Sequence, residues 1–208
     1  MSTLLLTLAG PMQSWGVADR HARRGTMPCP TMSGVCGLIA ACLGLEHGAD
    51  LAAEFDGVRF SVREDERPGR MSDFQTVGSL PRVRGGDSFQ TIGAGTRSAK
   101  VVVKDYLTGA AYTAALEADR PRLERWAEAL RHPAHAVGLG RRGCPPSRPF
   151  APRIEDAPAA GLFAGSHWWT GSSEGDAWVD APVRRDGNGG VWNTRAVAEH
   201  GGDFFDDL

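Results

Sequence analysis

The chain has 208 residues, of which 41% are hydrophobic and 23% are charged, a composition typical of a globular protein and not of a disordered one. Its formal net charge of -2 argues at first against a nucleic-acid-binding protein. Glycine is over-represented, with 27 residues, about 13% against a usual share of about 7%, which predicts many turns, bulges and close backbone approaches.

The first part of the chain predicts a strand followed by a helix. Residues 3–9 form a short apolar run that a Gly-Pro pair ends, which indicates a strand. Residues 33–43 carry apolar side chains at i, i+3, i+4, i+7 and i+8, the spacing of one face of an amphipathic helix. Thr31 or Ser33 can cap the start of this helix, and Gly44 can end it.

Several runs of β character follow. Residues 55–63 alternate apolar and polar side chains, as in a half-buried strand, and residues 71–77 predict the next strand. Residues 78–100 contain five glycines and predict a long hairpin or flexible excursion instead of a core element. Residues 100–107 and 111–116 then predict two more strands.

The second helix has clear signals at both ends. Asp119 caps its start, Pro121 lies in its first turn, and the pair His132–Pro133 ends it. Its buried stripe is expected to contain Leu123, Trp126, Ala127 and Leu130. Residues 135–139 predict a last short strand.

The order of these elements predicts an α+β fold. Strand, helix, strand, an inserted hairpin, then strand, helix, strand is the ferredoxin-like βαββαβ order, which RNA-recognition domains share. We expect this body to span residues 1–153. Residues 154–208 hold four of the six tryptophans and ten acidic residues, and predict a small β-rich C-terminal extension with an acidic tail. Topology alone indicates no function.

No local feature indicates secretion, a membrane span or a metal site. The N-terminus has no basic region before its apolar run, and no stretch approaches the roughly 20 apolar residues that span a bilayer. None of the four cysteines forms a CxxC pair, so we expect buried, reduced thiols in a cytoplasmic protein. We expect no cofactor and no metal.

Basic residues are concentrated in three segments that are rich in Gly, Ser, Thr or Pro. Residues 11–31 carry a net charge of +2, residues 81–104 carry +4 and residues 138–153 carry +4, while the rest of the chain sums to -12. If they converge on one face, such loops form an anion-binding surface. Charge alone is equally compatible with three unrelated solvated loops.

Three sequence motifs lie in or beside these segments. The first is GPMQSWG at 10–16, followed by RGT at 24–26 and PTMSGVCGL at 30–38. The second is KDYLTGAAYT at 104–113, and the third is LGRRGCPPSRP at 139–149. Taken together, they resemble the CasD family of CRISPR-associated proteins over roughly residues 3–150. Met32 departs from the family pattern, in which lysine is common at that position.

The resemblance implies a non-catalytic RNA-binding subunit of the type I-E CRISPR interference complex (Cascade), an RNA-guided antiviral defence. Such a subunit caps the 5′ handle of the CRISPR guide RNA and anchors the large subunit and the terminal backbone subunit. Target DNA is engaged only through the complex. The inserted hairpin, about residues 78–104, would be a thumb that presses between guide positions, with Phe89 near its tip as a candidate wedge.

The first and third motifs hold candidate RNA contacts for which a structural role is also open. Arg141 and Arg142 can fork onto phosphates or base edges, with a salt bridge at the rim as the alternative. Trp15 can stack on a base or lock the loop while buried, and Gln13 and Ser14 can read a base or close the turn.

The start of the first helix offers a further candidate contact. Backbone N–H groups at Ser33 and Gly34, with the hydroxyl of Thr31, can hold a phosphate, a role compatible with plain capping. The complete set of candidate RNA-binding residues is Gln13, Ser14, Trp15, Arg20, Arg23, Arg24, Thr31, Ser33, Gly34, Arg82, Arg84, Arg97, Lys100, Lys104, Arg141, Arg142 and Ser147.

Two other functions are weaker alternatives. A metal-independent endoribonuclease that processes CRISPR precursor RNA would need a His, Tyr or Lys to activate the 2′-hydroxyl. Tyr106, Lys104 and His21 are available, but their spacing forms no recognisable set, so we do not expect an enzyme. A small-ligand protein of the same topology has no phosphate-loop or dinucleotide motif in its favour.

Overall fold

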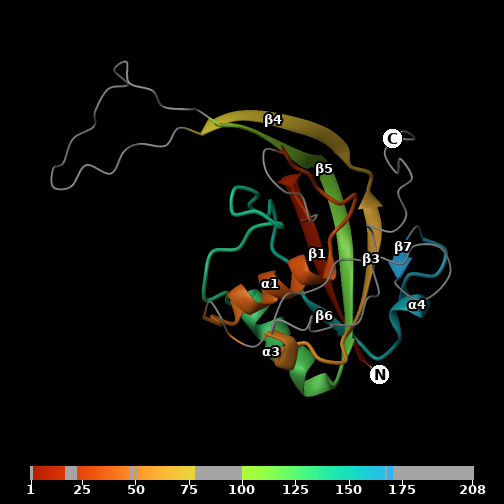
Figure 1. Cartoon of the computed structure of the whole chain (residues 1–208). Coiled ribbons are helices and arrows are strands. Elements are labelled where there is room, and N and C mark those ends of the chain that lie inside the picture. Colours follow the sequence, from red (N-terminus) through yellow and green to blue (C-terminus); the bar gives the residue numbers. More distant parts are fainter. Residues whose placement is uncertain are drawn as a thin grey trace, which may run out of the picture.

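The computed structural model describes residues 2–16, 23–46, 49, 51–77, 100–166 and 168–170 of the chain. Within these residues, seven strands form one sheet and four helices lie beside it (Figure 1). The expected mixture of helices and a sheet is therefore confirmed.

Strands β1 and β5 form the centre of the sheet. β1 spans Ser2–Gln13 and pairs antiparallel with β5, Lys100–Ala118. β6 (Arg153–Glu155) pairs antiparallel with the other edge of β1. On the far side, β3 (Arg59–Glu66) pairs antiparallel with β5, and β7 (Trp168–Thr170) pairs antiparallel with β3. The strand order is thus β6-β1-β5-β3-β7.

The first half of β5 lies outside this series of strands and has two other partners. β4, Gly69–Val77, pairs antiparallel with residues 100–108, and β2, Arg23–Arg24, pairs parallel with residues 103–104. Figure 1 shows β4 and β5 as a curved ribbon that extends beyond the helices. Two strands were expected in this region, but β5 is continuous: Gly109 adopts a φ of +60°, which glycine does at little cost.

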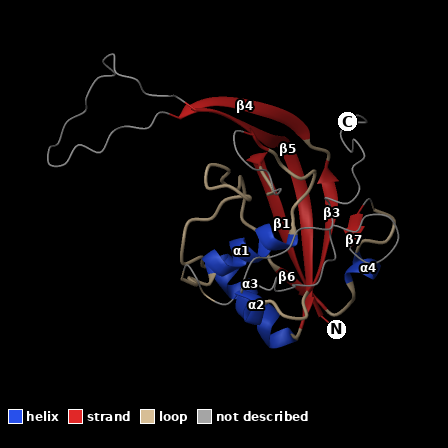
Figure 2. Cartoon of the chain, in the orientation of Figure 1, coloured by secondary structure: helices blue, strands red, loops and turns tan. Residues whose placement is uncertain are grey.

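Three helices cover one side of the sheet. α1 (Met32–Cys42), the single turn α2 (Leu51–Glu54) and α3 (Arg120–Arg131) gather on this side, whereas α4 (Ala159–Leu162) lies on the other (Figure 2). The main core lies between α1, α3 and the sheet, and a smaller cluster packs under α4. Alternate side chains of β1 point to opposite faces of the sheet, and accordingly Leu4, Leu6 and Leu8 belong to the main core while Leu5 belongs to the smaller one.

Local signals predict both longer helices closely. Asp119 accepts a hydrogen bond from the backbone N–H of Arg122, and the four residues of the expected stripe in α3 are all buried. α1 is capped by Thr31 and not by Ser33, and Gly44 follows its end with a φ of +73°.

Three expected strands differ in the structure. β1 does not end at the Gly10–Pro11 pair but continues through it to Gln13, paired with β5 on both sides of the pair. β3 begins at Arg59 and not at residue 55, because residues 55–57 form a turn in which Gly57 has a φ of +69°. Residues 135–139 form no strand. The backbone N–H of Leu139 instead donates to Cys144, and its carbonyl accepts from Ser14, so the segment closes a loop against the first motif.

The described part of the C-terminal extension adds to the same sheet. β6 crosses the expected boundary at residue 153, and it supplies the edge strand that was expected at 135–139. β7 provides the opposite edge. The expected acidic tail and residues 78–99 of the expected thumb lie outside the described residues.

Candidate nucleic-acid interface

The strand register brings two of the three basic segments together at the start of β5. Arg23 and Arg24 on β2 lie level with Val103 and Lys104 on β5. On the other edge of β5, Phe74 is opposite Val103, and Asp73 is opposite Lys104. Because side chains alternate along strands, two rows result. Phe74, Val103 and Arg23 share one side of the ribbon, and Asp73, Lys104 and Arg24 share the other side.

Arg141 ties the third basic segment to the same place. Its Nη2 donates to the backbone carbonyls of Arg24, at 2.8 Å, and Gly25, at 3.1 Å, and its Nη1 donates to the carbonyl of Asp105, at 3.3 Å. The guanidinium also lies over the ring of Tyr106, 4.9 Å from its centroid, a distance at which cation–π attraction operates. The described residues of all three basic segments therefore lie together.

Three cations on this surface have no acceptor for their side chains among the described residues. Arg24 and Arg142 are exposed and Lys104 is half-buried. None of the three side chains forms a hydrogen bond or ion pair within the described part of the chain. Cations without an internal partner are available to an anionic ligand, whereas the fork of Arg141 is already occupied by backbone carbonyls.

Asp105 is a buried acid beneath the basic surface. Its carboxylate accepts a hydrogen bond from Ser72 at 2.6 Å and one from Nε of Arg23 at 3.2 Å. Burial acts to raise the pKa of Asp105, but these hydrogen bonds and the charges of Arg23 and Arg70 outweigh it and hold the pKa below its usual value. The carboxylate therefore stays ionised and orients Arg23, whose side chain is 70% exposed.

The loop after β1 is built from buried polar groups. Gln13 donates from Nε2 to the carbonyls of Leu8 and Ala110, and its Oε1 accepts from the indole N–H of Trp15. Ser14 donates to the carbonyl of Asp105. Gln13 and Trp15 have no exposed surface, so this structure favours the loop-locking alternative over direct contact with a base.

The start of α1 is also packed against this loop. The hydroxyl of Thr31 accepts from the backbone N–H of Gly34 at 3.2 Å, and Ser33 lies 3.5 Å from the same hydroxyl. A β carbon on Gly34 would lie 2.8 Å from the ring of Trp15. Thr31 is buried, so capping accounts for its hydroxyl.

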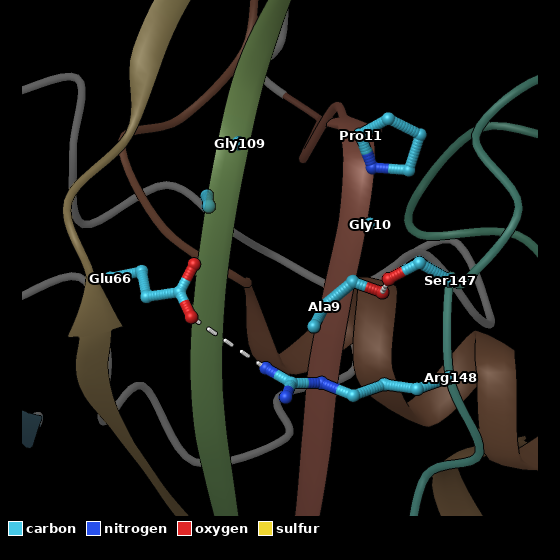
Figure 3. Close-up of a pocket in the computed structure, with 8 residues that line it drawn as sticks. Ala9, Gly10, Pro11, Glu66, Gly109, Ser147 and Arg148 are labelled. Atoms are coloured by element: carbon cyan, nitrogen blue, oxygen red, sulfur yellow. Dashed lines mark hydrogen bonds and ion pairs between the residues drawn. The ribbon is translucent and has the colours of Figure 1, made fainter.

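A separate hollow lies beside the middle of β1. Its volume is about 360 Å³, and it is lined by Ala9, Gly10, Pro11, Glu66, Gly109, Ala110, Ser147 and Arg148 (Figure 3). Ser147 donates from its hydroxyl to the carbonyl of Ala9, and Arg148 lies 3.9 Å from Glu66 across the hollow. Ser147 thus fixes the third motif to the edge of β1.

Several candidate residues lie beyond what the structure describes. Arg20, Arg82, Arg84 and Arg97, like Phe89, lie outside the described residues. Lys100 begins β5, and its side chain is not described. Their predicted contacts with RNA remain predictions.

The sequence interpretation overlooked two residues of the β4–β5 ribbon. Asp105 carries no signal for RNA binding in the sequence, because it is an acid within a basic motif. Phe74 lies in the strand expected at 71–77, and the sequence does not indicate which side of that strand is exposed. Its side chain is 68% exposed, and only the pairing with β5 reveals its neighbours.

The described residues hold neither a helix long and apolar enough to cross a membrane nor a group of three or more potential metal ligands.

Comparison with known proteins identifies the class to which the chain belongs. The family described as CRISPR-associated protein (Cas_Cas5) matches residues 3–195. The chain therefore belongs to this family of CRISPR-associated proteins.

A curated relative gives the particular branch. The CRISPR system Cascade subunit CasD of Escherichia coli (strain K12) is 35% identical over 163 residues, which are 72% of this chain and 69% of the relative. The resemblance to the CasD family is thus confirmed.

Two solved structures are similar in fold as well as in sequence. A chain of a "CRISPR RNA-guided surveillance complex" is 35% identical with a TM-score of 0.57, and the match covers 70% of this chain but only 60% of that one. A "Crystal structure of Cas protein" is 33% identical with a TM-score of 0.53, over 77% of this chain and 69% of the other.

Proposed function

We propose that this protein is a non-catalytic subunit of a type I-E Cascade complex and binds the 5′ handle of the CRISPR guide RNA. The observation that carries the proposal is the meeting of three basic segments: Arg24 lies level with Lys104, and Arg141, the neighbour of the exposed Arg142, donates to the carbonyl of Arg24. The relatives named for Cascade and for an RNA-guided surveillance complex support the same assignment. The large subunit and the terminal backbone subunit are its proposed neighbours, and the cytoplasm is its proposed location.

We further propose that the body is ferredoxin-like. In that arrangement the four strands of the βαββαβ unit lie in the order 4-1-3-2 with antiparallel neighbours. The series β6-β1-β5-β3, in which β1 precedes α1 and β5 precedes α3, has this order. The β4–β5 ribbon is then the root of the thumb hairpin.

The chemistry of the surface suits a single-stranded RNA. Arginine and lysine neutralise phosphates, and an arginine fork also suits base edges that are splayed out of a helix. The acids of the surface are already engaged, because Asp105 binds Ser72 and Arg23, and Asp73 accepts from Gln75. A net positive surface therefore remains on a chain whose total charge is negative.

A double substitution of two of these three cations tests this assignment. Lys104→Gln with Arg142→Gln should weaken binding of a labelled handle RNA to the full chain. Because each phosphate contact on a single strand contributes about 0.7 to the slope of log K against log salt, the slope should become shallower by about 1.4. The measurement is a titration at several salt concentrations.

Arg153→Gln is the matched control, since this exposed residue lies on β6 at the other end of the sheet. Unchanged affinity and slope in the double variant would contradict the proposed surface. Cleavage of a labelled repeat RNA by the metal-free protein, abolished by Tyr106→Phe, would contradict the non-catalytic role.

A further inference from the structure

One side of the β4–β5 ribbon presents an exposed aromatic ring. Phe74 is 68% exposed and Val101 is 42% exposed. The register places Thr76 opposite Val101 and Phe74 opposite Val103, so both exposed side chains share one side of the ribbon. Leaving a large ring in water forgoes the stabilisation that burial gives it, and a ligand that covers the ring would recover it.

Cationic side chains flank this ring. Arg23 lies in the same row across the ribbon, beyond Val103, at two strand spacings or about 10 Å. Arg70 lies on the same side of β4, four residues before Phe74. Asp105, the one acid on this side among the described residues of the ribbon, is paired with Arg23 and Ser72.

Arg23 keeps donors for a ligand while it is held in place. Its contact with Asp105 uses Nε, and the side chain is 70% exposed. The two terminal nitrogens of the guanidinium have no acceptor within the described part of the chain. A carboxylate that orients an arginine in this way presents the rest of the fork to phosphate.

We propose that Phe74 is a base-stacking residue, on which one unpaired base of the bound RNA lies while Arg23 contacts an adjacent phosphate. The inference rests on the proposed function, because it requires a single-stranded RNA on this protein. Stacking platforms for single strands combine an aromatic face with cations that follow the backbone, and this row contains both. The apolar core of a protein–protein interface, by contrast, is depleted of charge.

Substitution of the ring tests the proposal. Phe74→Ala should weaken binding of the handle RNA by the full chain about 5- to 150-fold, the range that corresponds to loss of one aromatic–base stack. The salt slope should stay unchanged, because stacking neutralises no phosphate. Phe74→Trp should retain the affinity. Arg153→Gln is again the control, since this exposed residue lies on β6 at the other end of the sheet.

A second measurement locates the base. The handle RNA is prepared with a single abasic position at each nucleotide in turn. One abasic position should weaken binding to the unaltered protein but not to Phe74→Ala, because both changes remove the same stack. If, at every position, the abasic change weakens binding to Phe74→Ala as much as it weakens binding to the unaltered protein, the proposal is overturned.

The remaining outcomes separate this inference from the proposed function. If Phe74→Ala binds normally while Lys104→Gln with Arg142→Gln binds weakly, the stacking role is wrong and the RNA-binding function stands. If neither variant affects binding, both are wrong. If Phe74→Ala binds RNA normally but fails to join the other subunits, the ring is a protein contact and the stacking role is again wrong.

Discussion

Arg141 and Arg142 are neighbours in the sequence but differ in what their side chains contact. Arg141 donates to three backbone carbonyls and lies over Tyr106, whereas Arg142 is exposed and has no side-chain partner in the described part of the chain. The sequence predicted both as RNA contacts, because a GRRG turn does not reveal which fork is used internally. Arg141 therefore positions the backbone at Arg24, and Arg142 is the one of the two that we propose for direct contact with RNA.

Replacement of each arginine by lysine separates these roles. Arg141→Lys keeps the charge but loses the planar fork, so the free energy of unfolding should fall by about 1.5–3 kcal/mol, the range for hydrogen bonds to a charged group. Arg142→Lys should leave it unchanged. Urea unfolding of both variants measures the difference. If Arg141→Lys and the unaltered protein are equally stable, the hydrogen bonds of the Arg141 guanidinium contribute nothing to the stability of the fold.

At the scale of the elements, α3 and α1 show how much of a helix the neighbouring residues in the sequence can predict. The cap, the proline and the apolar stripe of α3 are close together in sequence, and they predict the helix almost to the residue. The cap of α1 was left open between Thr31 and Ser33, because the choice depends on the loop of Trp15 that packs against it. The strand expected at 135–139 is absent for a similar reason, since the carbonyl of Leu139 accepts a hydrogen bond from Ser14, far away in the sequence.

The two glycines of α1 provide a matched test of that packing. Alanine is favoured over glycine in a helix by about 1 kcal/mol, and a β carbon on Gly37 would meet nothing within 4 Å, so Gly37→Ala should stabilise the protein by up to that amount. Gly34→Ala should instead destabilise it by about 1–3 kcal/mol, because the new carbon would lie 2.8 Å from the ring of Trp15 and 3.0 Å from the Thr31 hydroxyl. Thermal unfolding of the two variants gives the sign of each effect. A stabilising Gly34→Ala would mean that the loop of Trp15 moves freely away from the helix.

At the scale of the whole molecule, a net charge of -2 conceals a basic surface. The sequence identified three basic segments but left their convergence open, since only the pairing of β2 with β5 and the contacts of Arg141 bring them together. Contacts between segments that are far apart in the chain leave no local pattern in the sequence from which they could be predicted. The motifs nevertheless indicated the family, because they contain the residues, such as Gln13 and Trp15, that build the junction.

Gly140 is the position at which the third segment joins the first. Its φ is +81°, and a β carbon there would lie 1.8 Å from the carbonyl oxygen of Ser14. Gly140→Ala should therefore push the loop away from β1 and lower the free energy of unfolding by more than 1 kcal/mol. In protein that remains folded, it should also weaken binding of the handle RNA, because Arg141 and Arg142 move with the loop.

Gly143, in the same loop, is the control for this last prediction. A β carbon on Gly143 meets nothing within 4 Å, and its φ is not positive, so Gly143→Ala should change neither stability nor RNA affinity. Both quantities are measured on the same preparations by urea unfolding and by RNA titration. If Gly140→Ala lowers stability but leaves RNA affinity intact, the convergence of the segments supports the fold without forming the RNA-binding surface. A joint loss of stability and affinity, absent from Gly143→Ala, links the geometry of this one junction to RNA binding.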